Sequence, residues 1–156
     1  MAASARSRRI YIDSSIWIAL LAQEASAERL AQWLGNEEGK LFTALWTRTE
    51  LASALSIKAR RGELSQKQVT LLLREFEQWV TSGVQLLNID NRDFAHAAEL
   101  CARVKTRLRS GDALQLTVAS RHQTTHVATL DQDMGKNALE MGMQILKYDD
   151  NKKSSR

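Results

Sequence analysis

The chain has 156 residues, of which 44% are hydrophobic and 26% are charged, and its formal net charge is +4. A chain of this size buries roughly two thirds of its unfolded surface around one core, and the composition excludes disordered, collagen-like and disulfide-rich proteins. The single Cys101 and three scattered histidines exclude an internal disulfide and a structural zinc site, and no apolar run is long enough for a membrane span, so we expect a cytoplasmic protein.

Five short β-branched or apolar runs alternate with longer segments of helical periodicity. This alternation is typical of an α/β domain with a mostly parallel sheet. The expected strands cover residues 9–13, 40–44, 84–88, 125–129 and 143–147. We expect a single domain over residues 9–148, with flexible polar tails at 1–8 and 149–156.

The segments between these runs carry apolar residues at helical spacing. Stripes over residues 46–57 and 72–80 predict two helices, and Ser65 with Gln68 resembles a capping box at the start of the second. The four tryptophans fall on apolar stripes, so we interpret them as core or interface residues rather than as stacking platforms for bases. Helices are expected to end near three glycines, Gly62, Gly83 and Gly142.

Two aspartates lie at the carboxyl ends of predicted strands. Asp13 closes the first strand, and Asp131 follows the strand at 125–129. Ligands of open parallel sheets bind in the crevice at this edge, although an aspartate after a strand is equally typical of a helix N-cap. Asp133 lies two residues further on and is an alternative to Asp131.

Two further acids fall on the apolar sides of predicted helices. Glu50 shares its stripe with Trp46 and Ala54, and Asp112 shares a helix face with Leu116. A buried carboxylate needs a compensating partner. A salt bridge inside the core is the alternative explanation for Glu50, and an interaction with the helix dipole is the alternative for Asp112.

Four acids that face one crevice would repel one another unless they were protonated or bridged by a cation. Carboxylate oxygens are ligands for hard divalent cations, whereas zinc prefers cysteine or histidine. The acids therefore predict a Mg²⁺ or Mn²⁺ site.

Four sequence segments carry these acids: YIDSSIWIALL from Tyr11, TRTELASAL from Thr47, SGDALQLTVA around Asp112 and VATLDQDM around Asp131. Together they resemble the four acidic motifs of PIN-domain ribonucleases, and most closely those of VapC-type toxins of bacterial toxin–antitoxin systems, over nearly the whole chain. The acidic positions of the family carry over to Asp13, Glu50, Asp112 and Asp131, and its small hydroxyl residues carry over to Ser14 and Thr129.

The resemblance implies an α/β/α sandwich and a Mg²⁺-dependent endoribonuclease, typically a homodimer that a cognate antitoxin neutralises. Phosphodiester hydrolysis suits such a site, because a metal ion lowers the pKa of the attacking water and stabilises charge on the phosphate. We expect Asp13, Asp112 and Asp131 to bind the metal, and Glu50 to bind a second metal or orient the water. Asp133 stays an alternative ligand.

Basic residues flank the predicted acid site. Arg48, Arg107 and Arg109 are candidate RNA contacts, because phosphates that approach carboxylates need nearby cations. Arg103 and Lys105 belong to the same basic run before Asp112. Solvated helix faces would explain the same residues.

Other functions share part of this pattern. A dehalogenase-type phosphatase would need a second acid where Ser15 stands, and a response-regulator receiver would need an acidic pair and a late lysine that the chain lacks. Two alternatives stay open: a catalytically silent PIN fold that serves as a binding module, and a housekeeping RNA-processing nuclease without an antitoxin.

Overall fold

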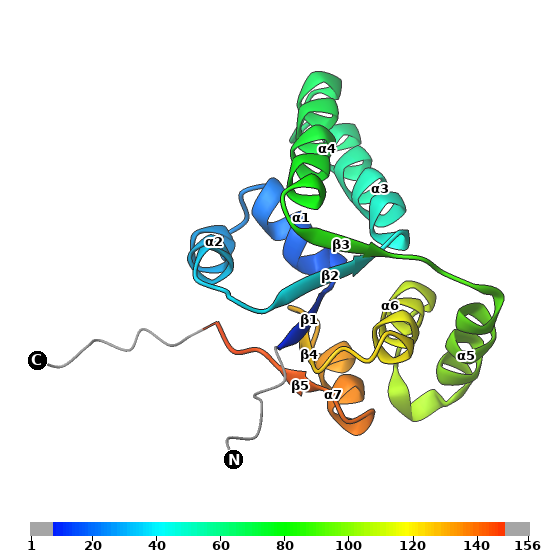
Figure 1. The fold of residues 1–156 in the computed structure, drawn as a ribbon. Helices are drawn as coiled ribbons and strands as arrows, with labels where there is room; N and C mark the ends of the chain where they lie inside the picture. The colour runs from blue at the N-terminus through cyan, green and yellow to red at the C-terminus, as the bar shows by residue number, and fades with distance from the viewer. Residues whose placement is uncertain (1–7, 149–156) are drawn as a thin grey trace, which may run out of the picture.

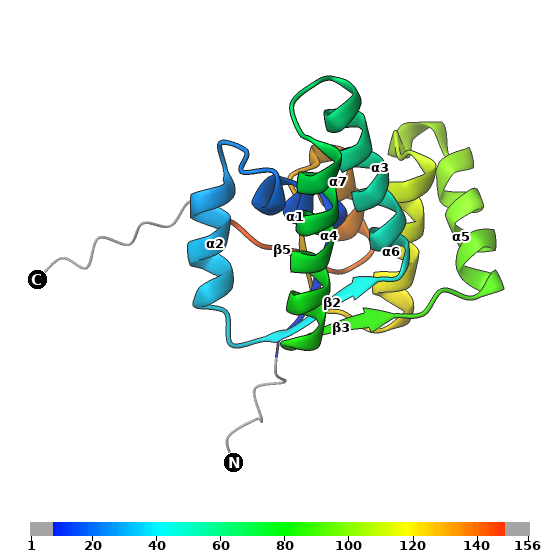
Figure 2. The same ribbon diagram turned by 90° about the horizontal axis from the view of Figure 1, so that it is seen from above.

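The computed structural model describes residues 8–148, and Figures 1 and 2 show how its elements are arranged. At the centre of this part of the chain lies a five-stranded sheet in the order β3-β2-β1-β4-β5, in which every neighbouring pair is parallel. The strands are β1 (Arg9–Ile12), β2 (Lys40–Ala44), β3 (Val84–Leu87), β4 (His126–Ala128) and β5 (Gln144–Ile145). The five predicted strands are confirmed, and all except β2 are shorter than predicted.

Seven α-helices and one 3₁₀ turn connect the strands within residues 8–148. They are α1 (Ser14–Leu21), α2 (Ala27–Gly35), α3 (Trp46–Arg60), α4 (Gln66–Thr81), α5 (Asn91–Ala102), η1 (Val104–Thr106), α6 (Ser110–Arg121) and α7 (Gln132–Glu140). Helices α1 to α4 cover one face of the sheet and helices α5 to α7 cover the other (Figure 1), so the predicted α/β/α sandwich is confirmed.

The central strand β1 separates two hydrophobic cores. Successive side chains of a strand point to opposite faces. Ile10 and Ile12 accordingly pack with Trp17 beneath α1 to α4, whereas Tyr11 packs beneath α5 to α7. All three β1 side chains are fully buried, which explains why this strand is a continuous apolar run rather than an alternating one.

The chain reverses direction across the sheet after β3. Strands β1, β2 and β3 are added towards one edge, and β4 then joins the other side of β1. In an open parallel sheet this change of direction opens a crevice at the carboxyl ends of the strands. The N–H of Asp13, just after β1, donates to the carbonyl of Ala128 at 2.9 Å. The ends of β1 and β4 are therefore held side by side at this crevice.

Local sequence signals set the ends of several helices. The predicted capping box of α4 is confirmed, because Gln68 N–H donates to Ser65 Oγ at 3.2 Å and Ser65 N–H donates to Gln68 Oε1 at 2.7 Å. Gly62 and Gly142 have φ angles of 78° and 85°. Glycine adopts this left-handed conformation at little cost, so α3 and α7 end just before these residues, as predicted.

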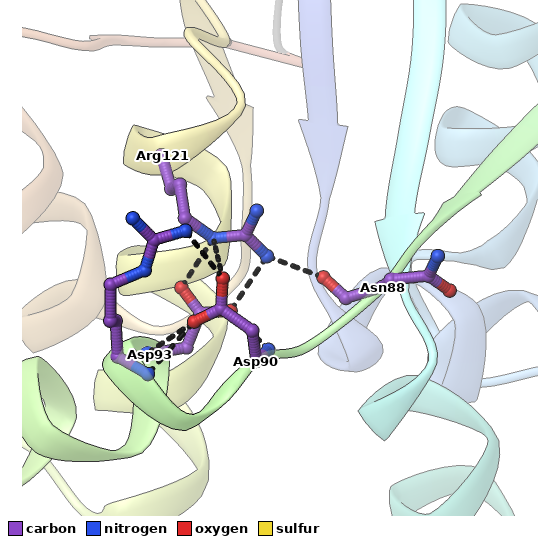
Figure 3. Close-up of polar contacts among 5 residues, drawn as sticks. Asn88, Asp90, Asp93 and Arg121 are labelled. Carbon is purple, nitrogen blue, oxygen red and sulfur yellow. Dashed lines mark hydrogen bonds and ion pairs between the residues drawn. The ribbon is translucent and has the colours of Figure 1, made fainter.

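A buried ion pair fastens the β3–α5 connection to α6 (Figure 3). Arg121 of α6 contacts the two carboxylate oxygens of the fully buried Asp93 at 2.7 Å each and donates to the carbonyl of Asn88 at 2.6 Å. Burial of Asp93 opposes its ionisation, but the bonds from Arg121 and from the backbone outweigh it and hold the pKa of this carboxyl below its ordinary value. This network lies apart from the acids singled out in the sequence and has a structural role.

The tryptophans lie in the cores, as predicted. Trp17 is fully buried, and the other three are half-buried against one of the two clusters. Cys101 is half-buried at the edge of the core beneath α5 and α6. No helix within residues 8–148 is long and apolar enough to cross a membrane.

The ends of the predicted domain are only partly described. Residues 1–7 and 149–156, predicted to be flexible tails, lie outside the described residues. Arg8, assigned from the sequence to the first tail, instead forms an ion pair with Glu37 at 2.9 Å and accepts a backbone hydrogen bond from Lys40 at 2.8 Å.

Candidate active site

Asp13 is buried at the carboxyl end of β1, beside the end of β4, and also caps a helix. Its side chain is 2% exposed and accepts hydrogen bonds from Ser15 Oγ at 2.6 Å, from Ser15 N–H at 3.3 Å and from Thr129 Oγ1 at 2.9 Å. The N–H bond makes Asp13 the N-cap of α1, so the capping role and the site position coexist. Burial raises the pKa of Asp13, and the Ser15 and Thr129 hydroxyls oppose this rise.

Neutral hydrogen-bond donors hold Glu50. Its Oε1 accepts from Trp46 Nε1 at 2.9 Å, and its Oε2 accepts from Gln115 Nε2 at 2.7 Å and from the Ser14 hydroxyl. No cation within residues 8–148 pairs with it, so the alternative of a core salt bridge is wrong. The half-buried carboxylate is compensated by neutral donors, which do not cancel its negative charge.

The raised pKa of Asp112 shows that the other acids lie near it. Its pKa is raised to about 6, first by burial and then by the negative charges of Asp13, Asp131 and Glu50, whereas a backbone hydrogen bond from Arg109 opposes the rise. Asp112 accepts no side-chain hydrogen bond within residues 8–148. The structure therefore brings together the four acids predicted from the sequence, and they repel one another there.

A glycine allows α6 to approach this cluster. A Cβ atom added to Gly111 would collide with Glu50 Oε1 and lie 3.3 Å from Trp46 Nε1. A larger residue at this position would displace the Glu50 carboxylate, so glycine lets the first turn of α6 pack against α3 with Glu50 in its observed place. This close approach of Gly111 to Glu50 was not predicted from the sequence.

Asp131 and Asp133 lie in different surroundings. Asp131 Oδ1 caps α7 by accepting from Met134 N–H at 2.7 Å, and its own N–H donates to the Thr129 hydroxyl at 3.1 Å. Asp133 forms an ion pair with Arg107 at 3.5 Å. Only Asp131 is among the acids that most raise the pKa of Asp112. Asp131 is thus the acid joined to the cluster, through both this charge and the Thr129 hydroxyl.

A buried polar chain beneath Glu50 was missed in the sequence. The Tyr11 hydroxyl donates to Gln115 Oε1, and Gln115 Nε2 also donates to Thr47 Oγ1 at 3.2 Å, besides its bond to Glu50. Tyr11 and Gln115 are both fully buried. The signal was a single glutamine, three residues after Asp112, inside the otherwise apolar core of a helix. This chain fixes the amide so that its NH₂ group faces the carboxylate of Glu50.

The acids have the chemistry of a site for a hard cation. Carboxylate oxygens are the ligands that Mg²⁺ and Mn²⁺ prefer, and Asp112 and Asp131 keep lone pairs that no side chain occupies. Within residues 8–148, no group of three acidic, histidine or cysteine side chains already has the arrangement that would hold an ion. The residues fit such an ion by charge and donor type.

The predicted basic residues separate into two groups. Arg48 makes a bidentate ion pair with Glu77 of α4, in which two guanidinium nitrogens each lie 2.7 Å from a carboxylate oxygen. The charge of Glu77 thus balances the charge of Arg48. Arg107 and Arg109 are exposed at the start of α6, next to the acids. The pairing of Arg48 joins two helices and was not visible in the sequence.

Comparisons with known proteins identify the family. The sequence pattern of the family described as PIN domain matches residues 10–139, whereas no curated protein gives a significant match. Three solved structures have similar folds. The VapC20 structure from Mycobacterium tuberculosis, described as a sarcin-ricin loop cleaving toxin, shares 17% identity with a TM-score of 0.66, over 82% of this chain and 94% of that one. FitAcB from Neisseria gonorrhoeae shares 20% with a TM-score of 0.64, over 89% and 97%. VapBC-1 from nontypeable Haemophilus influenzae shares 16% with a TM-score of 0.59, over 89% and 98%.

Proposed function

The chain belongs to the PIN domain family, and from this premise we propose that it is a divalent-metal-dependent endoribonuclease that cuts RNA at the acidic crevice. The observation that carries the proposal is the mutual repulsion of Asp13, Glu50, Asp112 and Asp131, which is expressed in the raised pKa of Asp112. Carboxylates that are held close together destabilise the folded protein, so such a cluster is typical of a site that binds a cation or transfers a proton.

Each acid has a proposed role. Asp13, Asp112 and Asp131 would hold Mg²⁺ or Mn²⁺, which supplies an activated water and stabilises charge on the phosphate. Glu50, fixed by its three donors, would orient the attacking water or hold a second ion.

Two hydroxyl residues support these acids. Ser14 would keep Glu50 aimed at the crevice, and Thr129 would keep Asp13 and Asp131 in register through its two hydrogen bonds. Neither hydroxyl needs to touch the substrate for this role.

The choice of RNA as substrate rests on two supports. The VapC20 protein, whose fold is similar, is described as a sarcin-ricin loop cleaving toxin. Arg107 and Arg109 also lie beside the acids, where a polyanionic substrate must approach.

Cleavage assays test this proposal. Single-stranded and structured RNAs would be incubated with the protein in Mg²⁺, in Mn²⁺ or in EDTA, and we expect cleavage only with a metal. Asp13→Asn should reduce cleavage by orders of magnitude, whereas Asp90→Asn, which alters the N-cap of α5, should leave it intact. Undiminished cleavage in EDTA would refute the metal site.

The fourth acid is assigned by a second pair of variants. Asp131→Asn should abolish cleavage, and Asp133→Asn should have the smaller effect, because only Asp131 joins the cluster. The reverse order would transfer the role to Asp133.

We further propose that the protein is the toxin of a toxin–antitoxin pair, a proposal that is supported by its similarity to the VapC and Fit structures. Expression alone should arrest growth, and co-expression of the product of the adjacent reading frame should relieve the arrest by forming a stable complex. A homodimer, also expected, would be measured by light scattering. Cleavage without growth arrest would favour a housekeeping nuclease, and metal binding without cleavage would favour a silent binding module.

A further inference from the structure

The connection between α5 and α6, residues 103–109, presents a row of exposed cations that begins before the two arginines beside the acids. Its four basic side chains are exposed, and the two residues that point inward are buried: Arg103, Lys105, Arg107 and Arg109 lie outside, and Thr106 and Leu108 lie inside. We propose that this basic loop is a preshaped surface that binds the backbone of single-stranded RNA and leads it to the acids. The inference rests on the proposed function and names the part of the chain that holds its substrate.

Thr106 holds the loop in one shape. Its hydroxyl donates to the carbonyls of Leu100 at 3.0 Å and Arg103 at 2.9 Å, and its own carbonyl accepts from Asn137 Nδ2 of α7 at 2.9 Å. Leu108, 8% exposed, packs into the core beneath α5 and α6. The loop is therefore anchored at its centre to α5 and α7, and the cations project from a fixed base, which reduces the entropy lost on binding.

The loop lies next to the acids. Arg109 directly precedes α6, which carries Asp112 in its first turn. Arg107 has a φ angle of 56° and forms an ion pair with Asp133, at the start of α7 beside Asp131. A polyanion bound along the loop would therefore reach the crevice without crossing another element.

The charges of the loop are available to a partner. Within residues 8–148, no acidic side chain pairs with Arg103, Lys105 or Arg109, and Arg107 has only the single contact at 3.5 Å. Val104 stands among them with 89% of its surface exposed, which folding does not explain. Cations interspersed with an exposed apolar side chain suit a strand that offers both phosphates and unstacked bases.

RNA fits this surface better than an acidic protein segment. The acids repel any anion, so an RNA whose phosphates approach them needs cations nearby, and the basic loop supplies these cations. A protein that inhibits the acids would instead carry positive charge, which the basic loop would repel. The basic loop is the nearest exposed positive surface to Asp112 in chain order.

The test measures binding apart from cleavage. Fluorescence anisotropy would follow a labelled single-stranded RNA in EDTA at salt concentrations from about 50 to about 300 mM, where affinity for a single strand falls with a slope near −0.7 per phosphate contact. Replacing Arg103, Lys105 and Arg109 with glutamine should weaken binding about fourfold per lost contact at about 0.15 M salt and flatten the slope. A control variant replaces two exposed cations elsewhere, Arg61 and Lys67 at the α3–α4 turn, and should bind as the wild type does.

Two further variants separate charge from loop shape. Arg107→Gly keeps the left-handed backbone and removes one cation, so it should lower the salt slope without lowering the melting temperature. Gln123→Gly, at a φ of 56° after α6, is its uncharged control and should not change binding. Thr106→Val should weaken binding with every cation in place, and Thr106→Ser, which keeps the hydroxyl, should restore it.

The outcomes distinguish the two proposals. The role of the loop would be overturned, even if cleavage persists, by either of two results. One is that the variant of Arg103, Lys105 and Arg109 binds RNA with the affinity and salt slope of the wild type, and the other is that the variant of Arg61 and Lys67 loses as much affinity. If a glutamate-rich peptide of the same net charge displaced the RNA from the loop, a protein would become the proposed partner of the loop in place of RNA. Absence of both RNA binding and cleavage in the wild type would instead overturn the proposed nuclease.

Discussion

Replacing Asp112 by asparagine is expected to stabilise the metal-free protein while destroying its activity. The pKa of this carboxyl rises from its ordinary value of 3.8 to about 6 on folding, through burial and then through the charges of Asp13, Asp131 and Glu50. Between these two pH values the folded protein binds more protons than the unfolded chain, so the stability contributed by this group is lost as the pH rises and stays lost above about pH 6.

The magnitude follows from this difference. A rise from 3.8 to about 6 corresponds to at most about 3 kcal/mol at neutral pH. The carboxyl is half-exposed, so water screens part of the repulsion, and asparagine also loses a helix-dipole interaction of about 0.3 to 1 kcal/mol. We expect a net gain of about 1 kcal/mol, which raises the melting temperature by about 2 to 4 °C.

The assay is urea unfolding in EDTA at about pH 4 and about pH 8. The gain of Asp112→Asn over the wild type should be present at the higher pH and shrink towards the lower one. Asp133→Asn is the matched control, since it also removes a half-exposed acid from a first helical turn, and it should give no gain. A variant less stable than the wild type at about pH 8 would show that Asp112 is a structural acid and would refute the reasoning.

Two further predictions concern residues that support the site, and a third concerns the ion pair of Asp93 with Arg121, which lies apart from it. Gly111→Ala should push its new methyl group into Glu50, lowering the melting temperature and the cleavage rate together. Gln115→Met should reduce the cleavage rate, and Tyr11→Phe should reduce it only when the glutamine is present, which a double-mutant cycle of cleavage rates would detect. Asp93→Asn should cost about 3 kcal/mol in urea unfolding, because it leaves the partly buried Arg121 with only its longer contact to Asp90 at 3.8 Å, yet metal-dependent cleavage per folded molecule should persist.

Local sequence patterns determined much of the fold. Strand β2 was predicted with its observed limits, because the polar residues on either side of this short run mark where it begins and ends. The capping box of α4 was predicted from Ser65 and Gln68 alone, since its hydrogen bonds join residues three apart. The limits of α5 were not predicted, although Asp90 and Asp93 form a capping box there, because aspartate at the second position departs from the usual glutamate or glutamine.

The candidate acids could be chosen from the sequence for a related reason. Asp13 and Asp131 follow strands whose carboxyl ends must share one edge, and Glu50 and Asp112 interrupt apolar helix faces. Periodicity and chain order are enough to identify such residues. Their roles as metal ligands remain proposals.

Tertiary structure alone decided which distant side chains meet. The order of the strands places β4 beside β1, and only this neighbourhood joins Thr129 to Asp13. Packing of α6 against α3 brings Gln115 to Glu50, and packing of α3 against α4 pairs Arg48 with Glu77. These contacts depend on how whole elements pack, which is a property of the folded chain and not of any local pattern within it.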